Sequence, residues 1–172
     1  MSTTHRVYVI VLIAVLFWCG LILAAPLLQA STGHAQSLAA LLYRFFSRIC
    51  HQLAERSFQV NGHPLAVCIR CSSIYGGFLV GVLLFPLLRD WVQRSVSPRV
   101  LFLLASLPMI VDVALSLSGI HESITWTRLG TGVLFGVAAP WMVLPPLLDA
   151  LTQRRDQLST SPGESLYARQ TE

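Results

Sequence analysis

Cysteine and histidine side chains gather in one short stretch of a chain that is otherwise strongly apolar. Cys50 and His51 are adjacent, and Cys68 and Cys71 follow further along, with two residues between them. Thiolate and imidazole groups are ligands that zinc prefers, and two cysteines three apart can share one metal ion or form one disulfide. The segment 50–71 is therefore where chemistry is expected.

The simplest interpretation is a zinc site with four ligands: Cys50, His51, Cys68 and Cys71. Zinc favours tetrahedral sets of thiolate and imidazole, and the Cys-x-x-Cys pair supplies two ligands from one turn. Adjacent ligands are less usual than ligands two to four apart, so His63 is a substitute for His51. Four protein ligands would make a structural site. Three would leave a position for water or substrate, with Glu55 as a general base.

Thiol–disulfide chemistry at Cys68 and Cys71 is a second hypothesis. The pair opens a predicted membrane helix, whose N-terminus favours a thiolate, and quinone-linked disulfide-forming enzymes are also small four-helix membrane proteins with such a pair. A relay needs a second pair, however, and only Cys50 is near, because Cys19 lies deep in the first apolar run. A third hypothesis is a non-catalytic scaffold or transport component whose loop is held by metal or a disulfide.

The elements that must position these residues are membrane helices. Of 172 residues, 54% are hydrophobic and 12% are charged, whereas soluble domains carry about 25% charged residues. A helix that spans a membrane needs about 20 mostly apolar residues. Because lipid offers no hydrogen-bond partners to the backbone, such a segment must be helical. Four segments qualify, namely 7–28, 72–88, 100–118 and 129–148. The first is longer than the core of a signal peptide and is expected to be retained.

Two further elements complete the predicted fold. One apolar stripe at helical spacing precedes the Cys/His loop and consists of Leu38, Leu41, Leu42, Phe45, Phe46 and Ile49. This stripe indicates an amphipathic helix, either in the membrane interface or packed on the bundle, that delivers Cys50 and His51. Asn61-Gly62 predicts a tight turn that folds the loop 50–71 back on itself. The prediction is an all-α integral membrane protein: one domain, 1–149, with a polar, disordered tail, 150–172.

The arginines give a weak indication of orientation. Four spans place Arg6, Arg89, Arg94, Arg99, Arg154, Arg155 and Arg169 on one side, and Arg44, Arg48, Arg56, Arg70 and Arg128 on the other. Positive charge concentrates in short cytoplasmic loops. Cytoplasmic termini and an outward-facing Cys/His loop are therefore expected.

Acidic and basic residues are predicted to meet at the Cys/His end of the bundle. Asp112 lies about 10 Å inside the third span, where an unpaired acid costs about 2.5–3.5 kcal/mol. Arg128 is its nearest candidate partner in sequence, and Glu122 lies in the loop between them. An Asp112–Arg128 bridge that fixes helix packing is one interpretation. The other is a polar pocket in which Asp112, Glu122 and Arg128 carry out catalysis together with Glu55.

Other function classes find no support in the sequence. The formal charge is +4 and no aromatic-basic stripe is present, so nucleic acid is not an expected partner. No phosphate loop, dinucleotide fingerprint, hydrolase elbow or haem-attachment motif occurs. The expected function is a membrane protein that binds zinc above a polar pocket at the membrane surface. A lipid or a quinone-like molecule is the expected ligand.

Two blocks of the sequence also resemble a known family. The first is Cys-His-Gln-Leu-Ala-Glu-Arg-Ser-Phe at 50–58, the Gly62 turn, and Val-Cys-Ile-Arg-Cys-Ser-Ser-Ile-Tyr-Gly-Gly-Phe at 67–78. The second comprises Pro108, Met109, Asp112, Gly119, Glu122, Ser123, Arg128, Thr131 and Gly132. Across 40–137 the chain resembles the small prokaryotic membrane proteins grouped as domain of unknown function 2085. The resemblance implies an integral protein of the cytoplasmic (inner) membrane of a prokaryote and names no activity.

Overall fold

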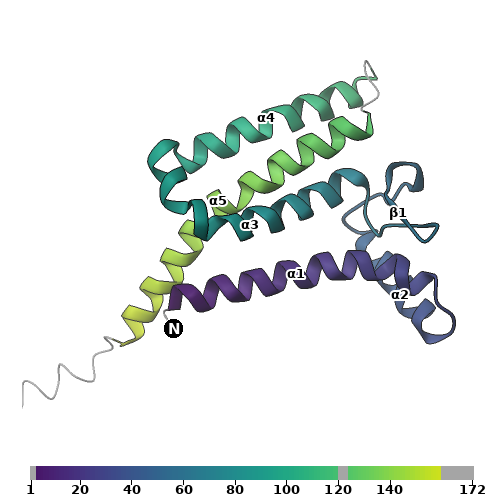
Figure 1. The fold of residues 1–172 in the computed structure, drawn as a ribbon, viewed down its shortest axis with the longest axis horizontal. Coiled ribbons are helices and arrows are strands. Elements are labelled where there is room, and N and C mark those ends of the chain that lie inside the picture. The colour runs from purple at the N-terminus through teal and green to yellow at the C-terminus, as the bar shows by residue number, and fades with distance from the viewer. Residues whose placement is uncertain (1–2, 120–123, 160–172) are drawn as a thin grey trace, which may run out of the picture.

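The chain folds into long helices with a small loop region at one end of the bundle (Figure 1). The computed structural model describes residues 3–119 and 124–159. The helices are α1 (Thr3–Gln29), α2 (His34–Phe46), the short 3-10 helix η1 (Ala54–Arg56), α3 (Ile69–Ser95), α4 (Pro98–Leu117) and α5 (Thr125–Ser159). Strands β1 (Gln59–Val60) and β2 (His63–Pro64) pair antiparallel. The predicted all-α class is confirmed.

Four of these helices are long and apolar enough to cross a membrane: His5–Gln29, Ile69–Val92, Pro98–Leu117 and Thr125–Leu151. Their mean hydropathy lies between 1.6 and 2.9. Large apolar side chains such as Phe17, Leu87 and Leu103 lie exposed on their outer faces. Apolar surface on this scale marks a lipid-facing side. The number of predicted spans is confirmed.

α1, α3 and α5 extend beyond the predicted spans at both ends, whereas α4 begins two residues early and ends one residue early. α3 begins at Ile69 and not at residue 72, so Cys68 is its N-cap residue and Cys71 lies in its first turn. α5 continues to Ser159, past the predicted domain end at residue 149. Residues 160–172 of the predicted tail lie outside the described part of the chain.

Glycines allow α3 and α5 to pack backbone against backbone. A methyl group on Gly77 would lie 2.7 Å from the carbonyl oxygen of Val133, and one on Gly81 would lie 2.5 Å from that of Val137. Gly132 and Gly136 of α5 approach the α3 backbone in the same way. Small residues four apart permit such close approach in lipid. The two Gly-x-x-x-Gly motifs therefore form one interface that aligns the N-terminal ends of α3 and α5.

An aromatic cluster attaches α2 to α1 and α3. The ring of Trp18 makes edge contacts with Phe45, Phe46 and Tyr75 at centroid distances of 5.4–5.8 Å. Phe46 and Cys50 belong to the same buried core. Leu38, Leu41 and Phe45 of α2 remain exposed. α2 therefore packs on the bundle and also presents an apolar edge, which combines both interpretations of its amphipathic pattern.

The hairpin follows the predicted tight turn. Asn61 and Gly62 both have positive φ, 54° and 77°, as the two central residues of a type I′ turn require. Leu65 then donates its backbone N–H to Phe58 O at 2.7 Å. The hairpin returns the chain toward α2, which brings the start of α3 close to Cys50.

Candidate metal centre

Three cysteine sulfurs meet where the loop enters α3. Cys50 follows the turn after α2, Cys68 caps α3, and Cys71 lies one turn into that helix. Their Sγ atoms all lie within 4.8 Å of one another, and none of them is in a disulfide. The backbone N–H of Cys68 also donates to Cys50 Sγ at 3.1 Å. The fold therefore brings together three of the four predicted metal ligands.

Hydrogen bonds from two side chains hold the loop in this shape. The Gln52 amide nitrogen donates to Tyr43 O at 2.8 Å and to Ala66 O at 2.6 Å. The Tyr43 hydroxyl donates to Pro64 O at 2.5 Å. These bonds link α2 to the segment that precedes Cys68. They fix the position of Cys50 relative to the N-terminus of α3, as a preorganised site requires.

The cluster favours a thiolate at Cys68. The Cys71 side chain donates a hydrogen bond to Cys68 and lowers the pKa of the Cys68 thiol to about 5, against a smaller opposing effect of burial. The backbone N–H of Cys71, the Cys50 thiol and the backbone N–H of Arg70 make smaller contributions to this lowered pKa. A thiolate is the form that both binds metal and acts as a nucleophile. Cys68 is thus ionised at neutral pH.

The sulfur separations suit a shared metal ion. Zn–S bonds of about 2.3 Å in a tetrahedron place sulfurs about 3.8 Å apart, whereas a disulfide holds them at about 2.0 Å. The observed limit of 4.8 Å is much closer to the first value. A small contraction of the loop would be enough for three thiolates to bind one ion.

A pocket of about 450 Å³ opens beside the three sulfurs. It is lined by Ile49, Cys50, His51, Leu53, Arg56, Cys68, Arg70, Cys71, Ile74, Met109, Ser116 and Arg128. The loop, α3, α4 and α5 all contribute to it. Three of the lining residues are arginines, so the wall is cationic on one part and apolar on another.

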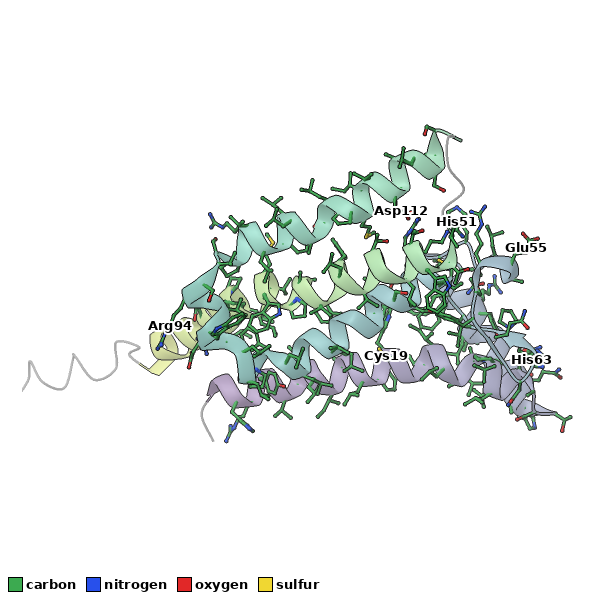
Figure 2. The ribbon with its side chains drawn as sticks, turned by 45° about the horizontal axis from the view of Figure 1, so that its top comes forward. Cys19, His51, Glu55, His63, Arg94 and Asp112 are labelled. Carbon is green, nitrogen blue, oxygen red and sulfur yellow. The ribbon has the colours of Figure 1, made fainter. Side chains whose placement is uncertain are left out.

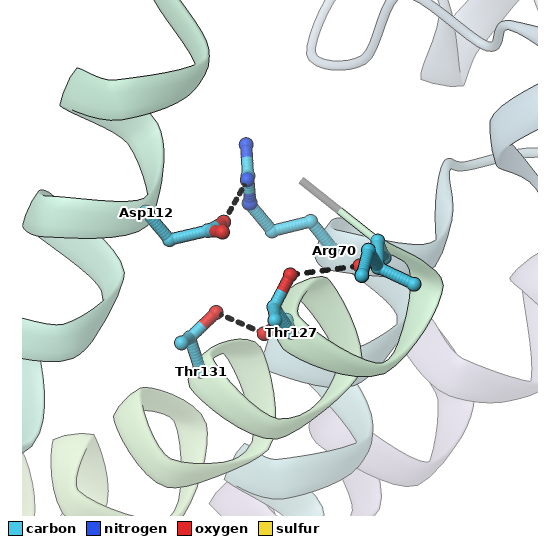
Figure 3. A network of polar contacts seen from close by, with 5 residues as sticks. Arg70, Asp112, Thr127 and Thr131 are labelled. Carbon is cyan, nitrogen blue, oxygen red and sulfur yellow. Dashed lines mark hydrogen bonds and ion pairs between the residues drawn. The ribbon is translucent and has the colours of Figure 1, made fainter. Parts of the chain in front are cut away.

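Asp112 is buried, and its partner is not the one expected from the sequence. Its carboxylate accepts a charge-assisted hydrogen bond from the Arg70 guanidinium (Figure 3). The expected Asp112–Arg128 bridge is therefore wrong as the principal pairing. α3 starts three residues earlier than predicted, and its glycine interface holds it close to α5. The helical first turn of α3 therefore brings the Arg70 guanidinium to the Asp112 carboxylate.

Threonines order the first turns of α5 below this ion pair. The Thr127 hydroxyl donates to Ile124 O at 2.8 Å, and the Thr131 hydroxyl donates to Thr127 O at 2.7 Å. In Figure 3 both hydroxyls lie on the side of α5 that faces Asp112 and Arg70. Ile124 O also accepts the backbone N–H groups of Thr127 and Arg128, so the hydroxyls add further hydrogen bonds to carbonyls that the helix already pairs.

The remaining predicted site residues lie at the same end of the bundle, with different relations to the pocket. His51 is exposed and lines the pocket, but its ring nitrogens are not among the ligand atoms grouped within 4.8 Å. Arg128 lines the pocket, whereas Glu55 is exposed on η1 and is not a lining residue. His63 is half-buried in β2. Figure 2 shows His51, Glu55, His63 and Asp112 at this end and Arg94 at the other. Glu122 lies outside the described residues.

Arg70 is the residue of the candidate site that sequence reasoning missed. In the sequence analysis, Arg70 served only as one of the positive charges that indicate membrane orientation. In the structure it lies between Cys68 and Cys71 and lines the same pocket. The available signal was its place within the Cys-x-x-Cys motif at a helix start. A residue between two cysteines that share a helix face points to a neighbouring face, and the length of the arginine side chain lets Arg70 still reach the pocket.

Comparisons with known proteins agree with this architecture. An uncharacterised protein of Methanocaldococcus jannaschii is 32% identical over 152 residues, which cover 87% of this chain and 97% of its own. A second uncharacterised protein, from Methanothermobacter thermautotrophicus, is 35% identical over 95 residues, or 54% of this chain and 81% of its own. No solved structure matches the chain. The family model described as "Predicted membrane protein (DUF2085)" matches residues 50–142, which include the three clustered cysteines, Asp112 and Arg128. This chain belongs to that family of membrane proteins.

Proposed function

We propose that this protein binds zinc through Cys50, Cys68 and Cys71, with His51 as fourth ligand, above a pocket that takes the head group of a lipid or a quinone-like molecule. The observation that carries the proposal is the group of three unbridged thiols within 4.8 Å on the wall of a pocket of about 450 Å³. Three thiolates and one imidazole form a common tetrahedral zinc set.

The fourth ligand follows from the chain around Cys50. His51 is adjacent to Cys50 and already lines the pocket, so a change in the 50–53 backbone is enough to bring its ring toward the sulfurs. Gln52, the next residue, has a positive φ of 50°. If His51 binds, the site is closed and holds the loop in place. If it does not, the zinc keeps an open position that faces the pocket, where it would act as a Lewis acid.

The pocket suits a ligand that is partly polar and partly apolar. Arg56, Arg70 and Arg128 supply charged donors, and Ile74 and Met109 supply apolar wall inside the membrane spans. Small-molecule sites are typically apolar with a few well-placed polar groups. A membrane lipid or a quinone-like molecule would reach this pocket from the bilayer with its head group at the arginines.

The proposed location is the inner membrane of a prokaryote with both termini in the cytoplasm. The family match and the four apolar helices support a membrane protein. The seven arginines on the side of the termini support this orientation through the positive-inside tendency. The metal centre would then face outward.

Elemental analysis of detergent-purified protein, with a free-thiol count on the same sample, tests the metal site. About one zinc per chain is expected, lost in Cys68→Ser and Cys71→Ser. Cys19→Ser is the matched control, because Cys19 is half-buried in α1 and outside the cluster. Its zinc content should equal that of the wild type. Protein without metal whose thiols are fully free would contradict the proposal.

Thiol–disulfide exchange at Cys68 and Cys71 is the second candidate, because the lowered pKa of Cys68 gives a thiolate next to a second thiol. Attack needs a thiolate, and a disulfide partner would reach it through the pocket. The thiol count separates the two functions. Two thiols that appear only after reduction, in protein without zinc, would favour the redox function.

A further inference from the structure

The helix α2 and the turn that follows it carry an exposed apolar row, which consists of Leu38, Leu41, Phe45 and Ile49. The four side chains are between 49% and 61% exposed. Because they are spaced three and four residues apart, they lie along one face of the helix. The buried residues Ala39 and Phe46 lie on a neighbouring face, which packs on the bundle. One face of α2 is therefore occupied by the protein, and the other offers a continuous apolar surface.

Aromatic contacts set the depth of this row in the membrane. Phe45 packs edge-on against Trp18 of α1 with ring centroids 5.8 Å apart, and Trp18 packs against Tyr75 of α3 at the same distance. Tyr75 is six residues into the span that begins at Ile69, or about 9 Å along the helix. Tryptophan and tyrosine concentrate where head groups meet acyl chains. The C-terminal half of α2 therefore lies beside the spans at that boundary.

Arginines border the exposed row. Arg44 and Arg48 are both exposed, and they follow Leu41 by three and seven residues, which places them beside it on the helix surface. No aspartate or glutamate occurs in the sequence before Glu55. α2 and the turns at its two ends therefore carry only basic charges, next to an apolar surface at membrane depth.

These three features together are those of a helix that lies in the membrane interface. Such a helix buries its apolar face about 5–10 Å into the boundary between head groups and acyl chains, and its basic residues attract anionic lipids. The depth of the aromatic contacts agrees with this range. Each arginine near an anionic membrane surface strengthens binding about fivefold. The bilayer around α1 and α3 is already at this depth, so it covers the row without a further partner.

We propose that the exposed row of α2 is immersed in the membrane interface and that Arg44 and Arg48 bind the phosphates of anionic phospholipids there. The proposal goes beyond the proposed function and does not depend on a bound metal. Ile49 belongs to the row and also lines the pocket beside the cysteines. The mouth of that pocket would then lie at the level of the lipid head groups.

Hydrogen–deuterium exchange of the full chain in lipid nanodiscs, with one chain in each disc, tests the proposal. The readout is the exchange rate of peptides from 34–49, measured by mass spectrometry. Exchange should be slower by about tenfold or more in discs that contain phosphatidylglycerol than in discs of phosphatidylcholine alone. The double variant Arg44→Gln, Arg48→Gln should abolish this difference. Arg94→Gln is the matched control and should keep it, because Arg94 is exposed at the opposite end of the bundle (Figure 2).

A second pair of variants tests the apolar row. Leu41→Ser should speed the exchange of 34–49 in both kinds of disc, because the serine hydroxyl is poorly accommodated among acyl chains. Ala40→Ser is the control, because Ala40 is exposed and lies outside the row. The two variants place the same residue at adjacent helical positions. The exchange of Ala40→Ser should match that of the wild type.

The outcomes separate anionic lipid, any lipid and a second copy of the chain. Exchange that slows with phosphatidylglycerol, and does so only when Arg44 and Arg48 are present, supports the proposal. Equal exchange in both kinds of disc, or loss of the difference in Arg94→Gln, would overturn the recognition of anionic lipid by these arginines. Equal exchange of Leu41→Ser and the wild type would overturn the immersion of the row. Slowing that occurs only with two chains in a disc would assign the row to a second copy.

Discussion

At the scale of the residue, the chemistry of the site centres on Cys68. It is the N-cap of α3, it accepts a hydrogen bond from Cys71, and its own backbone N–H donates to Cys50. The hydrogen bond from Cys71 stabilises negative charge on the Cys68 sulfur, and the backbone N–H of Cys68 stabilises negative charge on the Cys50 sulfur. The same contacts would share that charge with a metal ion. Both the metal-binding and the redox proposals therefore need a thiolate at Cys68. The ionisation of Cys68 can be measured whichever proposal holds.

Alkylation of Cys68 in metal-free, reduced protein should persist at acidic pH. Because the pKa of Cys68 is lowered to about 5, the thiolate is complete at neutral pH and disappears only as the pH falls through about 5. The iodoacetamide rate at Cys68, followed by peptide mass spectrometry, should show its inflection there. Cys71→Ala removes the side-chain donor and should move the inflection upward. An inflection of the wild type near 8–9, as for an ordinary thiol, would contradict the environment described for Cys68.

Asp112→Asn should destabilise the bundle and leave the zinc in place. The substitution removes the negative partner of Arg70, whose side chain is 23% exposed, while that of Asp112 is 8% exposed. Breaking one side of such a partly buried pair costs about 1–3 kcal/mol. Thermal unfolding in detergent should show a lower Tm, with unchanged zinc per chain. Loss of zinc would mean that the ion pair supports the metal centre and is not a separate part of the pocket.

At the scale of the element, the start of α3 decides the geometry of the site. The glycine interface with α5 and the hairpin that precedes α3 both position it. The spacing of apolar runs, the Gly-x-x-x-Gly motifs and the Asn61-Gly62 turn were all readable from the sequence. Each is a local pattern with a direct physical meaning.

Other features depend on tertiary placement and could not be read in this way. The start of α3 at Ile69 could not be predicted from the apolar run, because Arg70, Ser72 and Ser73 interrupt that run. The Arg70–Asp112 pair depends on the relative heights of α3 and α4, which no local pattern encodes. The two bonds of Gln52 likewise join segments that are distant in sequence.

Gly77→Ala should disturb the α3–α5 interface, and Gly76→Ala should not. A methyl group at Gly77 would lie 2.7 Å from Val133 O, whereas one at Gly76 would have no neighbour within 4 Å. Overpacking of this kind costs about 1–3 kcal/mol. In an open helical position, alanine is better than glycine by about 0.5–1 kcal/mol. Thermal unfolding of the two variants in the same detergent is the measurement. Equal Tm values for both would show that the helices do not approach this closely.

At the scale of the whole molecule, four spans, one amphipathic helix and a loop at one end make a small bundle with its chemistry at one membrane surface. The three clustered cysteines, three arginines and apolar side chains such as Ile74 and Met109 line one pocket at this end. A pocket with both charged and apolar lining suits a ligand with both kinds of group.

The orientation of the molecule has its own test. A green fluorescent protein fused at the C-terminus should fluoresce, and alkaline phosphatase fused at the same point should be inactive, because the arginine distribution favours cytoplasmic termini. The reverse pattern would place the metal centre in the cytoplasm, where a stable disulfide is rare. Such a result would weaken the redox candidate and leave the zinc proposal untouched.

The most direct test of the central claim is the zinc K-edge X-ray absorption of purified protein. The account predicts three sulfur scatterers at about 2.3 Å and one nitrogen at about 2.0–2.1 Å. In His51→Ala, the spectrum should keep the three sulfurs and exchange the imidazole for a lighter oxygen or nitrogen ligand. A zinc shell without sulfur, or purified protein without a zinc edge, would contradict the assignment of Cys50, Cys68 and Cys71 as a metal centre.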